Sequence, residues 1–368
     1  MQQNVRVVGV GRSAYHRSTP DWSPQLALSE TITCALADAG LEPWLIQQVY
    51  LCVHHSSAQT LQETVQRALG QQLPVIIVDA QGAGASHALY RARHDIETGR
   101  AHCVLVAGVD NGPLNVADEC TSAAWVGAAR EYVRRHQCRD ETFAMIAVKA
   151  RQHSLLNPDA GYGQPLSLDQ VLGTAGHFAP LTPQQFASPA SGSTALLVCS
   201  DEFARRFALR RPVHILAQVS SDELPVSTAE TNTALRDVGY DRETAVSWEV
   251  YERAGIGPAD IQLCELHDNS TITELLLYEA LGLCREGSAE QFIEDGDNTY
   301  GGNIVVNPSG GLLGMGSGAH TAGLAQCAEL VMHLRGQAGA RQVQNARIAL
   351  QQDAGAHGSS IVTLYRGS

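Results

Sequence analysis

One segment of the chain occurs twice, once in each half, and this internal repeat limits the possible folds more than any other feature. Residues 37–51 (ADAGLEPWLIQQVYL) and 252–266 (ERAGIGPADIQLCEL) have a glycine, a proline and an isoleucine at the same spacing. In each copy the pattern predicts a helix that ends at the glycine, a short proline turn and then a strand. The matched residues are Gly40 and Gly255, Pro43 and Pro258, and Ile46 and Ile261. One copy in each half indicates a duplication.

Each half continues with a strand, a turn of small residues, a helix and further strand. The expected elements are strands at 75–80 and 102–108 around a helix to about Thr98, then a helix over about 321–335 and strands at 348–352 and 360–365. Apolar strands that alternate with helices are typical of α/β folds whose sheets are buried. The sequence therefore predicts two similar α/β halves.

The domain organisation follows from this duplication. Residues 112–190 are richer in polar residues, proline and glycine, and we expect them to form a loop insertion with one amphipathic helix near 140–153. The N-terminal half then comprises residues 1–111 and 191–212, and the C-terminal half comprises residues 213–368. No segment between the halves has the composition of a flexible linker.

The charge and composition exclude several classes of function. The net charge is −13 and 44% of the residues are hydrophobic, as in a folded acidic protein. Nucleic acid is not an expected partner, because phosphate binding requires a basic surface. Lys149 is the only lysine, which leaves very few candidates for Schiff-base chemistry. No apolar run approaches the roughly 18 residues of a membrane helix, so no membrane span is expected.

The cysteines indicate neither a zinc site nor a disulfide framework, because the nine of them include no Cys-x-x-Cys pair and no repeated spacing. Cys103, Cys199 and Cys264 lie in apolar strand-like runs, where a buried free thiol is the usual state. The chain also begins with a strand rather than a basic and apolar leader. Together these features predict a cytoplasmic protein.

Several long motifs resemble those of the thiolase superfamily, and in particular its sterol-carrier-protein and lipid-transfer-protein type. These motifs are at 251–261 (YERAGIGPADI), 265–268 (ELHD), 278–283 (YEALGL), 296–302 (GDNTYGG), 307–313 (NPSGGLL) and 323–330 (GLAQCAEL). The resemblance covers essentially the whole chain. It implies a thiolase fold, in which two duplicated halves form α-β-α-β-α layers, and a homodimer. The resemblance places the dimer interface near 102–108, although that apolar sequence equally fits a central strand.

The first catalytic loop of the family lacks its nucleophile in this chain. The resemblance places Gly82 where thiolases have the cysteine that accepts the acyl group. Glycine has no side chain and cannot form an acyl-enzyme, so normal cysteine-dependent thiolase activity is not expected. Gly82 and Gly84 also permit a tight backbone turn, which is the structural interpretation of this loop.

The second loop keeps a histidine but has lost a proton-transfer group. His267 remains, while Asn269 replaces the family's acid–base cysteine. An amide can donate and accept hydrogen bonds but cannot transfer a proton near neutral pH. The resemblance gives His267 the role of orienting a water or a thioester oxygen. The alternative is a hydrogen-bonded histidine at a strand end.

The third and fourth loops also depart from the family pattern. Gly316 and Ser317 stand in the Gly-His-Pro position of thiolases, with His320 displaced three residues along the chain. His320 is either catalytic or exposed at a helix start. In the fourth loop, Asp353 is either a general base with a raised pKa or a turn cap. His357 follows in the same loop.

Histidines occur on all four loops, at His87, His267, His320 and His357. Their spacing has no metal-ligand signature, so we predict no metal and no cofactor apart from the thioester substrate. The first hypothesis is an enzyme for acyl-CoA or carrier-bound thioesters that performs acyl transfer, or aldolase-like formation or cleavage of carbon–carbon bonds, without a covalent step.

In this hypothesis His267, Asp353 and His320 are the catalytic residues, and backbone amides near Gly82 and Gly316 form an oxyanion hole. The substrate-binding residues are predicted to be Gly82, Asn269, Gly316, Ser317, His357 and Tyr300. Tyr300 is included because related steroid side-chain aldolases resemble thiolases but use tyrosines, and Ser317 stands where one is expected.

The alternative is a non-catalytic subunit that pairs with an active thiolase or with a small OB-fold acyl-CoA-binding protein. A third hypothesis is simple binding of acyl-CoA or lipid, which shares the same pocket and needs no chemistry. Turnover of thioesters by the isolated protein distinguishes the first hypothesis from the other two.

Overall fold

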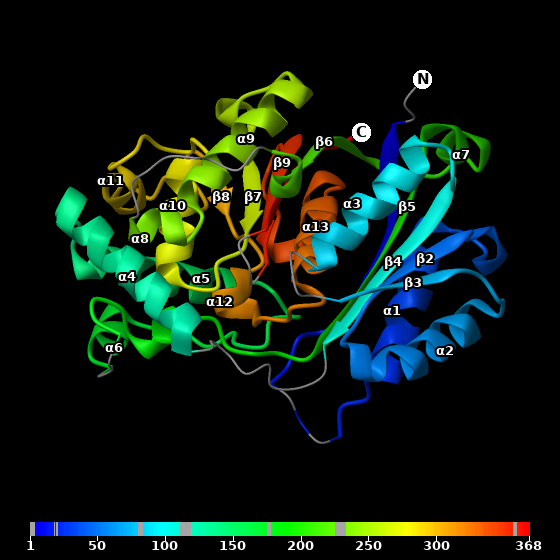
Figure 1. Ribbon diagram of the computed structural model, residues 1–368, viewed down its shortest axis with the longest axis horizontal. Helices are drawn as coiled ribbons and strands as arrows, with labels where there is room; N and C mark the ends of the chain where they lie inside the picture. The colour runs from blue at the N-terminus through cyan, green and yellow to red at the C-terminus, as the bar shows by residue number, and fades with distance from the viewer. Residues whose placement is uncertain are drawn as a thin grey trace.

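The computed structural model describes residues 4–17, 19, 21–79, 84–110, 119–174, 178–224, 233–355 and 359–368, with backbone only for 119–122. The strands of the first half are β1 (Val5–Arg12), β2 (Gln48–Cys52), β3 (Val75–Val78), β4 (Cys103–Asp110) and β5 (Gly192–Ser200). Those of the second half are β6 (Val213–Ser220), β7 (Leu263–Leu266), β8 (Val305–Val306), β9 (Ile348–Ala354) and β10 (Ser360–Arg366). They form one 10-stranded sheet in the order β3-β2-β4-β5-β1-β6-β10-β9-β7-β8 (Figure 1).

The helices of the first half are α1 (Pro24–Ala39), α2 (Ala58–Leu69), α3 (Gly84–Glu97) and α7 (Asp201–Arg206). Between β4 and β5 lie α4 (Glu119–His136), α5 (Asp140–Ser154) and α6 (Leu168–Leu172). The second half contains α8 (Ala234–Asp237), α9 (Tyr240–Ala254), α10 (Thr271–Ala280), α11 (Ala289–Glu294), α12 (Gly311–Met315) and α13 (Ala322–Leu334). Among the described residues, no helix is both long enough and apolar enough to cross a membrane.

The two halves of the sheet have the same topology. Read outward from the junction, the first half runs β1-β5-β4-β2-β3 and the second runs β6-β10-β9-β7-β8. In each half the first two pairings are antiparallel and the next two are parallel. The halves meet where β1 pairs with β6, with Arg6 opposite His214 and Val7 opposite Val213. This equivalence confirms the predicted duplication.

The repeated segment has the same local structure in both halves. Helix α1 ends at Gly40 with φ 64°, and α9 ends at Gly255 with φ 66°. Both values lie in the left-handed region, which favours glycine because it has no Cβ. A 3₁₀ turn follows in each copy, at Pro43–Leu45 and at Pro258–Asp260. The glycine and proline signals were therefore interpreted correctly.

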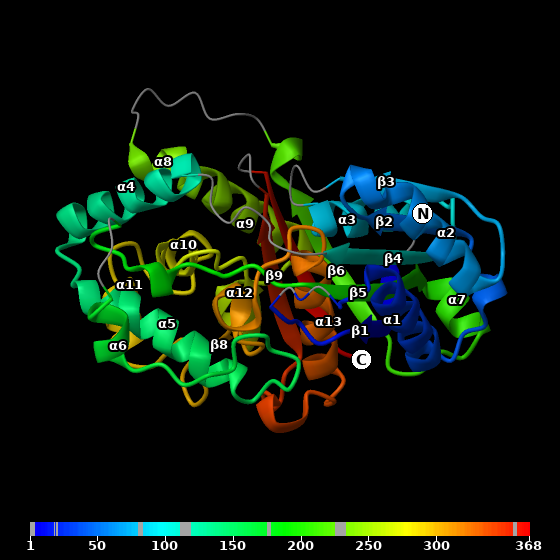
Figure 2. The same cartoon turned by 90° about the horizontal axis from the view of Figure 1, so that it is seen from below.

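The elements form five layers. Helices α3 and α13 pack against each other between the two halves of the sheet, and both views place them in the middle of the molecule (Figure 1, Figure 2). Helices α1 and α2 cover the outer face of the first half. Helices α9 and α10 cover the outer face of the second half. This is the predicted α-β-α-β-α arrangement.

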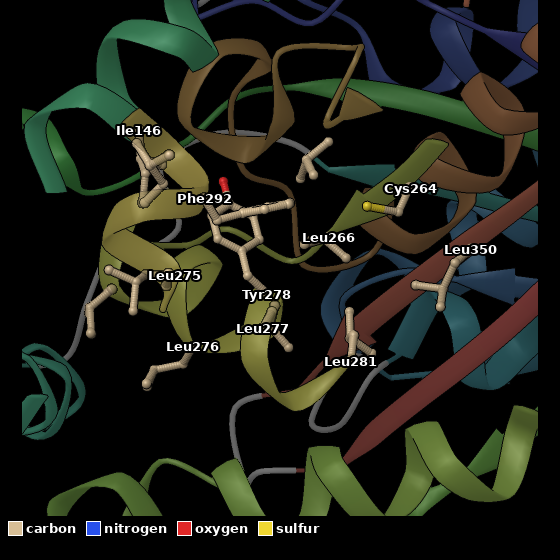
Figure 3. Close-up of a cluster of buried hydrophobic side chains, with 14 of the residues drawn as sticks. Ile146, Cys264, Leu266, Leu275, Leu276, Leu277, Tyr278, Leu281, Phe292 and Leu350 are labelled. Atoms are coloured by element: carbon tan, nitrogen blue, oxygen red, sulfur yellow. The ribbon is translucent and has the colours of Figure 1, made fainter. Parts of the chain in front are cut away.

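The segment between β4 and β5 contributes helices to the core of the second half. The expected helix near 140–153 is α5, whereas α4 was not anticipated. Ile146 of α5 packs in a cluster with Leu275 and Tyr278 of α10 and Phe292 of α11 (Figure 3). The Lys149 ammonium pairs with the Glu274 carboxylate of α10 inside this layer. The segment therefore forms an integral part of the core.

Strand β4 occupies a central place, because it pairs with β2 on one side and with β5 on the other. Both of its backbone edges are used, so the expectation that residues 102–108 form a dimer interface is wrong and the central-strand alternative is correct. The terminal strand of the first half is β3. Cys103, Cys199 and Cys264 are buried free thiols, as predicted.

Candidate active site

Polar side chains gather where the parallel strands of both halves end. His54 follows β2, Asp79 follows β3, and Asp110 is the last residue of β4. In the second half His267 follows β7 and Asp353 lies near the end of β9. Carboxyl ends of parallel strands meet at one edge of a sheet, which is where α/β proteins bind ligands. The described side chains are therefore arranged around one candidate site.

His267 and Asp353 form the first histidine–carboxylate pair. The Nδ1 atom of His267 lies 2.8 Å from Oδ1 of Asp353. The backbone N–H of His267 donates to Oε1 of Gln352 at 3.1 Å, which holds the loop against β9. Asp353 is buried, while the imidazole of His267 remains partly exposed. A carboxylate that accepts the Nδ1 proton leaves Nε2 with its lone pair, as a general base requires.

A third carboxyl group lies behind this pair. Glu243 of α9 accepts hydrogen bonds from Nε2 of Gln352 at 3.1 Å and from Oγ of Ser360 at 2.7 Å. Burial raises the pKa of Glu243 to about 7, even though both hydrogen bonds act in the opposite direction. Gln352 therefore connects a partly buried acid on α9 to the loop that carries His267.

His320 and Asp110 form the second pair. Nδ1 of His320 lies 2.8 Å from Oδ1 of Asp110, and the same carboxylate accepts hydrogen bonds from the His320 N–H and the Thr321 hydroxyl. Nε2 of His320 lies 3.7 Å from Oδ1 of Asp79. Burial lowers the pKa of His320, but Asp110 and Asp79 together outweigh it and raise that pKa above its ordinary value. Two carboxylates thus favour the imidazolium form.

The two histidine–carboxylate pairs lie near each other, because a carboxylate of each pair acts on Cys52. Burial raises the pKa of its thiol, and the negative charges of Asp110 and Asp353 raise it further. Both carboxylates are therefore close to this cysteine at the end of β2. Its Sγ lies 3.7 Å from the carbonyl oxygen of Gly84 at the start of α3. A thiol in such surroundings stays protonated, unlike the activated thiolate of a nucleophilic cysteine.

Close backbone approaches hold the site together. A methyl group on Gly323 of α13 would overlap both Oγ of Ser86 and Oδ2 of Asp353. A methyl group on Gly108 of β4 would overlap the carbonyl oxygen of His320. Glycine is required at both places because any Cβ would push these neighbours apart.

Three predicted binding residues have other contacts in the structure. Oδ1 of Asn269 accepts a hydrogen bond from the Thr273 hydroxyl at 2.6 Å. The amide of Gly316 donates to the Leu312 carbonyl at 3.0 Å, and the amide of Ser317 donates to the Ser188 carbonyl at 2.8 Å. The Gly316 amide, expected to bind an oxyanion, is therefore engaged within the protein.

Tyr300 does not join the candidate site. It precedes β8, and its hydroxyl donates to the carbonyl oxygen of Arg341 at 2.6 Å. His267 lies beyond the opposite ends of the parallel strands. His87 lies on α3 next to the ring of Tyr90, and burial lowers its pKa. Gly82 and His357 lie outside the described residues.

Sequence reasoning missed Asp79, Asp110, His54 and Glu243. The two aspartates each end a run of apolar residues, and this signal could have identified them. Glu243 carried no signal, because an acidic residue in an amphipathic helix is normally exposed. The described residues contain no group of three or more His, Cys, Asp or Glu side chains arranged to hold a metal ion.

Comparisons with known proteins identify the class. Residues 227–366 match the family described as thiolase C-terminal domain-like. The chain is 36% identical over 396 residues to sterol carrier protein 2 of Gallus gallus, covering 99% of this chain and 72% of that protein. It is 30% identical over 365 residues to the benzoylsuccinyl-CoA thiolase subunit BbsB of Thauera aromatica, covering 94% and 92%.

Solved structures agree with this result. The Ltp2-ChsH2(DUF35) aldolase superposes with a TM-score of 0.82 at 26% identity, covering 98% of this chain and 97% of that chain. Human mitochondrial 3-ketoacyl-CoA thiolase superposes with a TM-score of 0.75 at 15% identity, covering 100% and 99%, and shows the shared fold alone. The molecule therefore has the thiolase fold. Within that superfamily, the chain belongs to the sterol-carrier-protein and lipid-transfer-protein type of thiolase-like proteins.

Proposed function

We propose that this protein binds acyl-CoA or carrier-bound acyl thioesters and catalyses an aldolase-like reaction, or an acyl transfer, without a covalent acyl-enzyme. The single observation that carries the proposal is the presence of two histidine–carboxylate pairs near Cys52. Each pair contributes an oriented imidazole, and such groups are typical of general acid–base catalysis.

The geometry supports a division of roles in the cleavage of a 3-hydroxyacyl thioester. Nε2 of His267 accepts the proton of the substrate hydroxyl while Asp353 stabilises the resulting imidazolium. The bond between the α and β carbons then breaks, which yields a carbonyl compound and the enolate of the shortened thioester. The imidazolium of His320 stabilises the enolate charge and donates its Nε2 proton to the α carbon. His267 then releases the hydroxyl proton to solvent, so that the overall reaction consumes no proton. The same steps in reverse form the carbon–carbon bond.

The residue that the resemblance aligns with the family nucleophile supports a non-covalent route. That residue is Gly82, which offers no thiol, and the buried thiol of Cys52 has a raised pKa. Asn269 cannot shuttle protons in the second loop. The proposed chemistry needs none of these groups, because it uses His267 and His320 directly.

The second candidate is a non-catalytic subunit. One relative is named as a thiolase subunit, and the Ltp2-ChsH2 neighbour is an aldolase that contains a DUF35 protein. These names favour a heteromeric assembly, with a DUF35 protein or an OB-fold acyl-CoA-binding protein as partner. A homodimer through the edge strand β3 is compatible with either candidate, because β3 ends the sheet.

A panel of acyl-CoA and 3-hydroxyacyl-CoA esters tests the proposal. The protein is incubated with each ester, alone and with any partner encoded beside it, and products are followed by mass spectrometry. We expect a carbonyl product and a shortened acyl thioester, with no acyl adduct on the intact protein. An absence of turnover in both settings contradicts the enzymatic proposal and favours the subunit.

A further inference from the structure

Asp110, His320 and Asp79 form a row that runs from the interior to the surface. The exposed fraction of the side chain rises from 3% for Asp110 to 6% for His320 and 36% for Asp79. The three residues come from β4, from the turn before α13 and from the end of β3. Segments distant in sequence thus place a histidine between a buried and an exposed carboxylate.

The two ring nitrogens of His320 differ in their contacts. Nδ1 is bound by Asp110 at 2.8 Å, and Asp110 is itself held by the His320 amide and the Thr321 hydroxyl. Nε2 is buried and has no hydrogen-bond partner among the described residues. It faces Asp79 Oδ1 at 3.7 Å, which is slightly too long for a hydrogen bond but within reach of a small side-chain rotation. The imidazole is therefore fixed on one side and free on the side toward Asp79.

We propose that Asp79 is a proton-relay residue that exchanges protons between solvent and Nε2 of His320 during turnover, an inference that rests on the proposed function. When His320 has given its Nε2 proton to the substrate carbon, it is left neutral. The Asp79 carboxylate then takes up a proton from hydronium ion or from a buffer acid. It passes this proton to Nε2, which restores the imidazolium and returns Asp79 to the carboxylate. In the reverse reaction the same proton leaves by the same route.

The other titratable groups that face His320 are few. The ring of His54, in the loop after β2, lies 6.4 Å from the His320 ring between centroids and is exposed. Burial raises the pKa of the Cys52 thiol, and burial also raises the pKa of Tyr15 to about 12. Both of these groups stay protonated near neutral pH. His54 is thus the only further candidate among the described residues for a change of charge beside His320.

Substitution of Asp79 by asparagine tests the relay. D79N keeps the shape of the side chain but cannot carry a proton, so we expect kcat to fall by about 10-fold or more. Added imidazole buffer or another small proton donor should restore the rate in proportion to the concentration of its acid form, while the wild-type rate stays unchanged. D169N, in which an exposed aspartate on α6 is changed in the same way, is the matched control and should retain full activity. The kcat of H54Q and its response to added buffer show whether His54 also carries protons to His320.

Imidazole NMR titration supplies a second measurement that needs no turnover. The His320 resonance is assigned by its loss in H320Q, and its midpoint in D79N should lie below that of the wild type, since a facing carboxylate is lost. An unchanged midpoint, or a D79N rate that is normal or insensitive to buffer, overturns the relay alone. A wild-type protein without turnover on any thioester overturns the proposed function, and the relay with it.

Discussion

The two histidines of the proposed mechanism, His267 and His320, illustrate how neighbouring residues decide the role of an identical side chain. Each has a carboxylate on Nδ1, at 2.8 Å in both cases. His320 also has Asp79 facing Nε2, and the two carboxylates raise its pKa against the effect of burial. Nε2 of His267 faces no second carboxylate among the described residues. The same imidazole is therefore suited to act as an acid at position 320 and as a base at position 267.

Removal of either member of the His267–Asp353 pair should abolish most of the activity. We expect H267A and D353N each to lower kcat by about 100-fold or more, because a positioned general base contributes on that scale. The double variant should be little worse than the single ones, since the two residues act as a unit. Steady-state kinetics on the best thioester checks this, with H87A as the control. If the fold-losses in kcat of the two single variants multiplied in the double variant, the two residues would not act as a unit.

Glu243 should make the folded state less stable as the pH rises. Its pKa is about 7 in the folded protein, above the ordinary value of 4.5 for a glutamate. The folded state thus binds the proton more tightly, and stability should fall between about pH 4.5 and pH 7, by up to about 3 kcal/mol. E243Q lacks this ionisation, so its stability relative to wild type should increase with pH in urea unfolding experiments. A difference that does not vary with pH would show that Glu243 is not buried as a neutral acid.

At the level of elements, the site depends on how closely α3 and α13 approach the sheet. Gly323 lies where a methyl group would overlap Ser86 and Asp353. G323A should therefore destabilise the protein by about 1–3 kcal/mol and displace Asp353, which lowers kcat as well. G257A is the control, because no atom lies within 4 Å of its added methyl group and its φ is negative. Equal stability of the two variants would contradict the close approach.

The contact between α5 and α10 contains the only lysine of the chain. Lys149 and Glu274 form an ion pair whose side chains are 6% and 0% exposed. K149M leaves an uncompensated buried carboxylate and should cost about 3–5 kcal/mol in the free energy of unfolding. A K149M/E274L variant should recover much of that loss, as measured by guanidinium denaturation. Full stability in K149M alone would indicate that the pair contributes nothing.

At the level of the whole molecule, the sheet has two free ends of unequal character. Strand β3 ends the first half with four residues, of which Val75, Ile76 and Ile77 are only partly buried. Strand β8 ends the second half with two residues, both buried. An apolar edge strand that is only partly covered is a natural pairing surface, because its backbone groups lack partners on one side.

The proposed homodimer should therefore depend on β3. Size-exclusion chromatography with light scattering should give twice the chain mass for the wild type, and I76K should give a monomer because a buried lysine opposes pairing. Circular dichroism shows whether the variant remains folded. E63K, on the exposed face of α2, serves as the control and should stay dimeric. A monomeric wild type would contradict the homodimer and favour a heteromeric partner.

The fold was largely predictable because its signals are local. The glycine caps at Gly40 and Gly255 depend on one residue's backbone preference, and the apolar strands depend on a few consecutive side chains. Helix α4 was missed because its segment was interpreted as a polar loop insertion. The dimer strand was misplaced at 102–108 because an apolar run looks the same in a central strand and in an interface.

The sequence by itself determined the duplication and the buried thiols. Its resemblance to the thiolase superfamily implied the five-layer fold and the presence of His267, His320 and Asp353 on candidate loops. Only the tertiary structure decided which groups meet: Asp110 and Asp79 reach His320 from other strands, and Tyr300 lies at the far end. The physical reason is how far apart in the sequence the interacting residues are. Caps and strands are set by neighbours in the chain, whereas the charge of a histidine is set by carboxylates that are distant in sequence and within about 4 Å in space.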